Sequence, residues 1–235
     1  MISIFKIQDT VLKVSVEAKK LVPEIPEIKS ENKLLFELVL CILSSQEKYE
    51  VALQVMKKFR QEDILRIPKN KTEFKVIEAL IRNTLEKPVK FKFNEKVYSR
   101  RLRFFIKKGN YIINTIKNIY FNDLSIKKIL KTCCCVNETR KNIIKYTVGL
   151  GPKQASMFLR NIGYYSDFAV LDKHVIDYMR LIGITFISET NFSNISSYQK
   201  IETKLKSYAE INNLSLLHLD LAIWITMRTL KQKIR

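Results

Sequence analysis

The sequence predicts an all-α protein, and three observations support this prediction. Apolar residues recur with the 3.6-residue period of amphipathic helices through most of the chain. Alternating runs that would indicate strands are scarce. Only five glycines and five prolines interrupt the 235 residues, so long helices can form between them.

The helices are expected between identifiable breaks. Pro23 and Pro26 end the first helix and place residues 21–29 in a linker, Pro88 marks a second break, and residues 185–196, rich in Ser, Thr and Asn, form a loop before the last two helices. The periodicity predicts helices over residues 7–20, 31–43, 48–59, 71–84, 94–105, 107–120, 125–131, 137–148, 152–162, 173–182, 197–211 and 215–231.

The charge balance indicates a polyanionic partner. The chain has 42 Lys and Arg against 23 Asp and Glu, a formal net charge of +19. Such an excess favours binding to phosphates, because each neutralised phosphate releases condensed counterions. DNA, RNA and an anionic membrane surface all fit this charge. No apolar run reaches the ~20 residues that span a bilayer, and residues 1–20 lack the apolar stretch of a secretory signal. We therefore expect a cytosolic protein.

The four cysteines do not form a metal-binding pattern. They are Cys41 and the adjacent run Cys133, Cys134 and Cys135, with no CxxC pair and no Cys/His spacing of a zinc site. We therefore expect buried or reduced thiols.

A glycine turn between two helices is the most informative segment. In KNIIKYTVGLGPKQASMFLRNIG, residues 141–163, the turn Gly149-Leu150-Gly151 precedes Pro152, which suits the first position of a helix. Glycines permit positive φ and a close backbone approach, and amides at a helix N-terminus attract phosphate. A plain connection between helices is the alternative interpretation of this turn.

Two residues near this turn can carry chemistry. Lys153 lies in the first turn of the second helix, where the helix dipole disfavours a positive charge, and desolvation there would favour a nucleophilic neutral amine. Asp172, in LDKHV, precedes a new helix and is expected to be its N-cap. A carboxylate held in this way could also stabilise a cationic sugar or move a proton. Asp177 is a less favoured candidate, and Lys153 could instead contact phosphate alone.

Together these features resemble the helix–hairpin–helix DNA glycosylase superfamily. Three segments are most similar to the archaeal-type 8-oxoguanine DNA glycosylase/lyase branch, and they are ELVLCILSSQ at residues 37–46, GLGPKQASMFLRNIGY at 149–164 and LDKHV at 171–175. The resemblance extends from about residue 32 to the C-terminus. It implies an enzyme whose nucleophile is Lys153 and whose assisting carboxylate is Asp172. Such an enzyme cleaves the strand by β-elimination through an imine, without a redox cofactor or a catalytic metal.

The resemblance also implies a substrate and a binding mode. The substrate would be double-stranded DNA that contains an oxidised purine, flipped out of the stack. Gly149, Leu150 and Gly151 would hold a DNA phosphate, with a structural monovalent cation as an option. We expect a monomer in a prokaryotic, archaeal cytoplasm, associated with the nucleoid. The branch reads the oxidised base with a C-terminal lysine, whereas this chain ends at Arg235.

The candidates for base recognition are Gln46, Trp224, Lys233 and Arg235. Trp224 lies in an apolar helix and is expected to pack mainly in the core. Two basic stretches with interleaved aromatics, at residues 90–93 and 100–105, could line the DNA or wedge the gap left by the flipped base. The alternative is that their phenylalanines face the core while the cations stay solvated.

The expected organisation is two helical subdomains that flank a DNA-binding cleft. Residues 1–30 would be an N-terminal extension, residues 31–48 with 183–235 one subdomain, and residues 49–182 the helix–hairpin–helix subdomain. Two other functions stay open. One is a monofunctional glycosylase for another damaged base, in which Asp172 activates water. The other is a non-catalytic helix–hairpin–helix module that binds DNA.

Overall fold

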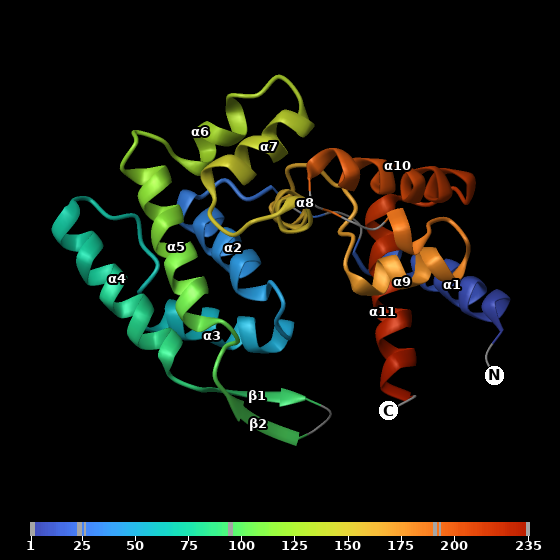
Figure 1. The fold of residues 1–235 in the computed structure, drawn as a ribbon, viewed down its shortest axis with the longest axis horizontal. Coiled ribbons are helices and arrows are strands. Elements are labelled where there is room, and N and C mark those ends of the chain that lie inside the picture. Colours follow the sequence, from blue (N-terminus) through green and yellow to red (C-terminus); the bar gives the residue numbers. More distant parts are fainter. Residues whose placement is uncertain are drawn as a thin grey trace. The chain divides into compact units, whose positions relative to one another are not determined.

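The computed structural model describes residues 3–22, 25, 27–93, 96–189, 192 and 194–233. Its α-helices (Figure 1) are α1 (Ile4–Leu21), α2 (Glu31–Ser44), α3 (Tyr49–Gln61), α4 (Lys71–Glu86), α5 (Phe105–Tyr120), α6 (Ile126–Lys131), α7 (Val136–Tyr146), α8 (Pro152–Asn161), α9 (Lys173–Leu181), α10 (Ile195–Ile211) and α11 (Leu216–Lys233). A single 3₁₀ turn is described at Ile187–Glu189. The predicted helical class is confirmed, and most helices lie within a few residues of their expected bounds.

The helix predicted over residues 94–105 is wrong. In its place β1 (Val89–Phe93) and β2 (Lys96–Arg100) pair antiparallel, with Val89 opposite Arg100 and Phe91 opposite Tyr98. Val89 and Phe91 are buried while Lys90 and Lys92 are exposed, which is the two-residue period of a half-buried strand. The buried face packs on α3, and the rings of Phe91 and Tyr98 stack 5.6 Å apart.

The chain divides into two packing units, Met1–Glu27 with Leu159–Arg235, and Ile28–Phe158. These bounds differ from those of the expected domains because α1 and α9 both pack against α11, whereas α2 packs against α3, α5 and α6. The first thirty residues are therefore divided between the two units. Most of α1 belongs to the same core as the C-terminal helix.

The core of the unit Ile28–Phe158 is built around α2. Leu34, Leu35 and every residue from Leu38 to Leu43 of this helix are buried. A helix that is apolar all round belongs inside a fold, and α3, α5 and α6 cover it. In Figure 1, α4 lies along the outer side of α5.

The other unit has an apolar core drawn from α1, α9, α10 and α11. Tyr178 and Tyr198 are fully buried in it, and their hydroxyls have hydrogen-bond partners. Among the described helices, none combines the length and apolar character that crossing a membrane requires.

Candidate functional site

The predicted helix–turn–helix at residues 141–163 is present as α7, a tight turn and α8. Gly149 has φ +80°, and a Cβ added to it would lie 2.1 Å from Cδ2 of Tyr111. Gly149 is therefore required by both its backbone conformation and its neighbour. A Cβ on Gly151 would find its nearest atom, Oε1 of Gln154, at 3.8 Å. The fold alone thus does not require the second glycine of the turn.

The turn is held by hydrogen bonds before and after it. Before the turn, Val148 N donates to Thr115 Oγ1 at 3.0 Å. The side chain of Leu150 is buried, and Ala155 N donates to Gly151 O at 3.0 Å as the first turn of α8 begins. Residues 149–151 are consequently a defined surface turn at the N-terminus of a helix, as phosphate binding requires.

Lys153 is partly buried in the first turn of α8, near α2. Burial and the charge of Glu37 raise the pKa of the Cys41 thiol. The charge of Lys153 lowers it by a smaller amount. Cys41 Sγ also lies 3.9 Å from Oε1 of Glu37. Lys153 therefore lies within electrostatic reach of a buried thiol.

Asp172 is the N-cap of α9, as predicted. Its Oδ1 accepts from the amides of His174 at 2.8 Å and Val175 at 2.9 Å. Within the part of the chain that the structure describes, Oδ2 accepts no hydrogen bond. One oxygen thus fixes the carboxylate, and the other remains available to a ligand.

Lys153 and Asp172 belong to different packing units, Ile28–Phe158 for the lysine and the unit with Leu159–Arg235 for the aspartate. The N-cap role of Asp172 is confirmed, and the catalytic roles of both residues stay predictions. That both reach the same substrate stays a prediction. Asp177 is paired with Arg180 at 3.9 Å.

The residues expected to read the base have varied surroundings. Gln46 is exposed in the turn after α2 and has φ +52°, an uncommon conformation for a residue with a Cβ. Trp224 is only partly buried, and the guanidinium of Arg228 lies 4.7 Å from its ring. Lys233 is in the last turn of α11 without a described side chain, and Arg235 lies outside the described residues.

The turn that carries Gln46 is fixed by a buried cation. Lys108 Nζ donates to Leu43 O at 2.7 Å, at the end of α2. Burial lowers the pKa of Lys108 to about 8, against an opposing effect of Glu47. Glu47 in turn accepts from Arg100 Nη2 at 2.8 Å and from Arg103 N at 2.7 Å. Sequence reasoning missed this network, because its members are dispersed along the chain.

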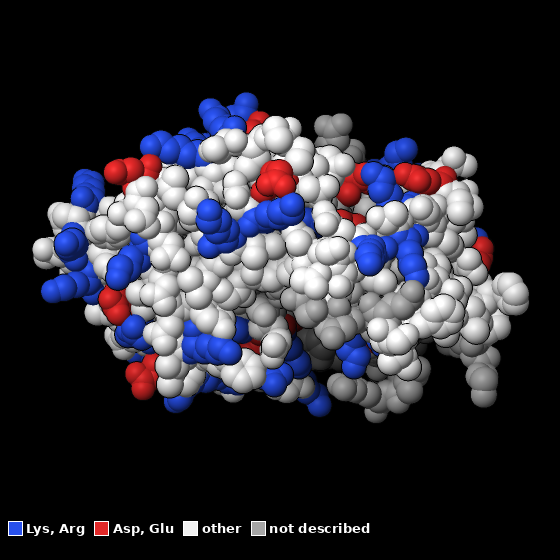
Figure 2. All heavy atoms as spheres, turned by 45° about the horizontal axis from the view of Figure 1, so that its top comes forward, with Lys and Arg blue, Asp and Glu red and all other residues white. Residues whose placement is uncertain are grey.

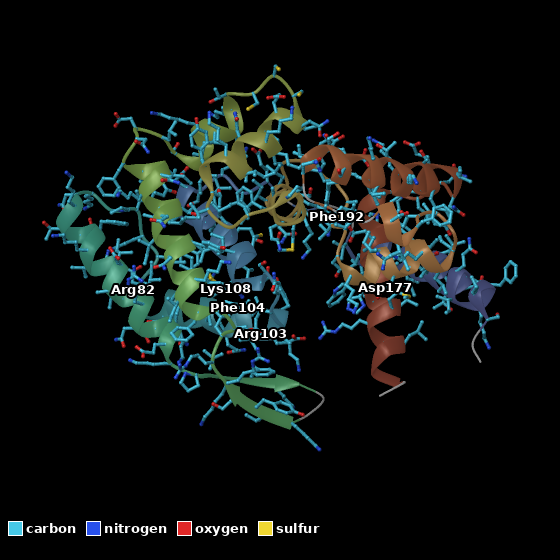
Figure 3. The ribbon with its side chains drawn as sticks, viewed as in Figure 1. Arg82, Arg103, Phe104, Lys108, Asp177 and Phe192 are labelled. Atoms are coloured by element: carbon cyan, nitrogen blue, oxygen red, sulfur yellow. The ribbon has the colours of Figure 1, made fainter. Side chains whose placement is uncertain are left out.

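Phe104 was also not singled out by the sequence beyond its place in the basic stretch 100–105. It has φ +55° and ψ +35° at the N-cap of α5, and its ring is exposed. The guanidinium of Arg103 lies 5.4 Å from that ring, and Figure 3 shows both residues beside Lys108 at the start of α5. A bulky residue in this conformation is strained, which is typical of functional positions. Figure 2 shows basic side chains spread over the drawn face, with fewer acidic ones.

The chain matches known proteins over most of its length. Residues 69–214 match the family model described as "8-oxoguanine DNA glycosylase". A curated 8-oxoguanine DNA glycosylase/AP lyase from Saccharolobus solfataricus is 32% identical over 84% of this chain and 83% of its own. The protein of that name from Fusobacterium nucleatum is 30% identical over 80% and 76%.

The solved structures give a similar result. The crystal structure of the Methanocaldococcus jannaschii 8-oxoguanine glycosylase/lyase, in complex with a 15mer DNA containing 8-oxoguanine, matches with a TM-score of 0.64. It is 25% identical, and the match covers 93% of this chain and 89% of that one.

Proposed function

This chain belongs to the 8-oxoguanine DNA glycosylase family, and we propose on that basis that it excises 8-oxoguanine from double-stranded DNA and then cleaves the strand as an AP lyase. The observation that carries the proposal for this chain's own residues is the hairpin. It positions Lys153 directly after a turn whose first glycine no other residue can replace without strain.

The proposed chemistry begins at Lys153. Its uncharged amine attacks C1′ of the damaged nucleotide, the bond between C1′ and the base breaks, and the base leaves with a proton. Opening of the sugar ring gives an imine between Nζ and C1′. Loss of a proton from C2′ and departure of the 3′ phosphate then cleave the strand by β-elimination.

Asp172 would act on the same sugar. Its Oδ1 is held by two amides at 2.8 and 2.9 Å, which fix the orientation of the carboxylate. Its Oδ2 can therefore stabilise the positive charge that develops on the sugar as the base departs, or accept a proton from the attacking amine. The residues Gly149, Leu150 and Gly151 would hold a phosphate of the same strand through backbone amides.

A monovalent cation would fit at this turn. Within the described residues, the carbonyl oxygens of Val148, Gly149 and Leu150 accept no hydrogen bond, and oxygen donors of this kind suit a hard cation. Residues 148–150 would hold such an ion, and it would supply positive charge for binding a DNA phosphate. Weaker duplex binding after exchange of K⁺ for a bulky organic cation at constant ionic strength would support this role, and unchanged affinity would argue against it.

Borohydride trapping tests the function. The protein is incubated with duplexes that each carry one lesion, among them 8-oxoguanine, uracil and an abasic site, and with undamaged DNA. We expect a covalent complex and strand cleavage with the 8-oxoguanine duplex. Lys153→Gln should lose both and still bind DNA, whereas Lys145→Gln, at an exposed position on α7, should keep both.

The other outcomes separate the alternative functions. Base release without trapping would assign a monofunctional glycosylase, and duplex binding with neither would assign a DNA-binding module. We further propose a monomer that acts in the cytoplasm, which size-exclusion chromatography and cell fractionation would test.

A further inference from the structure

The segment immediately before Asp172 is buried but has no regular secondary structure. Phe168, Ala169, Val170 and Leu171 are each less than 8% exposed, and none belongs to a helix or strand. Buried backbone amides outside helices and sheets need other partners, because an unpaired one costs free energy.

Three successive amides of this segment bond to side chains from distant helices. Ala169 N donates to Oε1 of Glu202 at 3.0 Å, and Val170 N donates to Oδ2 of Asp220 at 2.7 Å. Leu171 N donates to the hydroxyl of Tyr198 at 3.0 Å, and that hydroxyl donates to Ala169 O at 2.7 Å. We call Tyr198, Glu202 and Asp220 the amide clamp.

Burying the two carboxylates of the clamp costs free energy. Its three side chains are each less than 10% exposed, and burying carboxylates is unfavourable unless charge and hydrogen bonds compensate. Arg160 supplies the charge for Asp220, with Nη1 at 2.5 Å from Oδ2. Burial raises the pKa of Asp220 in opposition to Arg160, and the charge of Asp172 raises it further.

The clamp ends where the candidate carboxylate begins. Leu171 is the last clamped residue, and Asp172 follows with its own amide bonded to Val170 O at 2.7 Å. The clamp thus fixes the backbone before Asp172, while the first turn of α9 fixes its Oδ1. Arg160 extends this network to the last turn of α8, the helix whose first turn carries Lys153.

We propose that Tyr198, Glu202 and Asp220 are positioning residues of the glycosylase, which hold the backbone of residues 169–171 so that Oδ2 of Asp172 meets the sugar. This inference rests on the proposed function. A clamp that served stability alone would contribute to folding without affecting the rate of base release.

A matched pair of variants separates the two roles. Tyr198→Phe removes only the hydroxyl that joins Leu171 N and Ala169 O. Tyr178→Phe removes a hydroxyl from an equally buried tyrosine of the same core, whose partner is the hydroxyl of Tyr208. Both should lower the melting temperature. Only Tyr198→Phe should slow single-turnover release of 8-oxoguanine, by about tenfold or more, because small displacements of reacting groups are costly. Duplex affinity should be unchanged.

A second comparison tests the clamp chemistry. Glu202→Gln keeps an oxygen that can accept from Ala169 N, so it should keep the rate, whereas Glu202→Leu should lose it. Equal rates for Tyr198→Phe and Tyr178→Phe, or equal loss in the two Glu202 variants, would overturn the proposal.

Hydrogen exchange distinguishes a failed clamp from a failed function. Amides of residues 169–172 should exchange faster in Tyr198→Phe than in Tyr178→Phe at matched global stability. If the wild-type chain releases no 8-oxoguanine, the proposed function fails, and with it the catalytic purpose of the clamp. Unchanged exchange in Tyr198→Phe would show that the clamp does not hold the segment, whatever the activity.

Discussion

Replacing Asp172 separates its structural role from its chemical one. Oδ1 accepts two amides at the start of α9, at 2.8 and 2.9 Å. Asp172→Ala removes both bonds and should cost about 1 kcal/mol of stability, as loss of an N-cap does. Asp172→Asn keeps an oxygen acceptor there and removes a negative charge that acts on buried Asp220, so its stability should stay close to that of the wild type.

The rates of base release in the two variants should not follow their stabilities. A positioned carboxylate that moves a proton or stabilises charge contributes about 10²–10⁴ to a rate, which is about 3–5 kcal/mol of activation free energy. Both variants should therefore lose base release by this factor, and Asn should be no better than Ala. Single-turnover release of 8-oxoguanine measures the rate, and urea denaturation measures the stability.

Asn194→Ala provides the control. Asn194 caps α10 in the same unit through one bond from Ser197 N at 2.9 Å. Its loss should lower stability like that of Asp172→Ala and leave the rate intact. A wild-type rate in Asp172→Asn would refute the chemical role, and equal destabilisation by Asn and Ala would refute the capping argument.

Three further predictions concern the unit Ile28–Phe158. The free energy of unfolding of Gly149→Ala should fall by about 1–2 kcal/mol because of the positive φ alone. The new Cβ of Gly151→Ala meets nothing closer than 3.8 Å. This variant should therefore unfold like the wild type in urea and bind duplex DNA more weakly. Lys108 has a pKa of about 8, below its ordinary value of 10.5, so the unfolded chain binds more protons between these pH values. The free energy of unfolding of the wild type should therefore rise from pH 8 toward pH 10 relative to that of Lys108→Met, and the two curves should run parallel below pH 8. Parallel curves over the whole range would contradict the lowered pKa. Iodoacetamide should modify exposed Cys134 in the native protein and leave Cys41 intact, because Cys41 is buried and its pKa is raised; mass spectrometry that finds Cys41 alkylated first would refute this.

Local sequence signals were sufficient for most of the fold. Pro152 and the two glycines before it marked the start of α8, and Asp172 marked the start of α9, because each acts on the few residues next to it. The strands were missed for a related reason. Each strand has only five residues, β2 is exposed at its first four positions, and the lysines of Val89–Phe93 were read as a basic patch.

The amide clamp could not be predicted in this way. Tyr198, Glu202 and Asp220 lie 27 to 50 residues from the amides that they bind. In the sequence, Tyr198 and Glu202 are ordinary members of a helical pattern, and Asp220 interrupts an apolar one. Only the fold shows that all three converge on one segment of buried backbone.

The geometry of Asp172 allows a capping residue to serve also as the proposed catalytic carboxylate. A carboxylate has two oxygens, and an N-cap uses one of them. The helix amides that bind Oδ1 fix the orientation of the whole group, so Oδ2 has a defined direction without needing a partner of its own. The cap signal in the sequence therefore located the residue correctly, but it could not distinguish a structural aspartate from a functional one. That distinction depends on what approaches Oδ2, and the buried clamp behind the residue determines where Oδ2 lies.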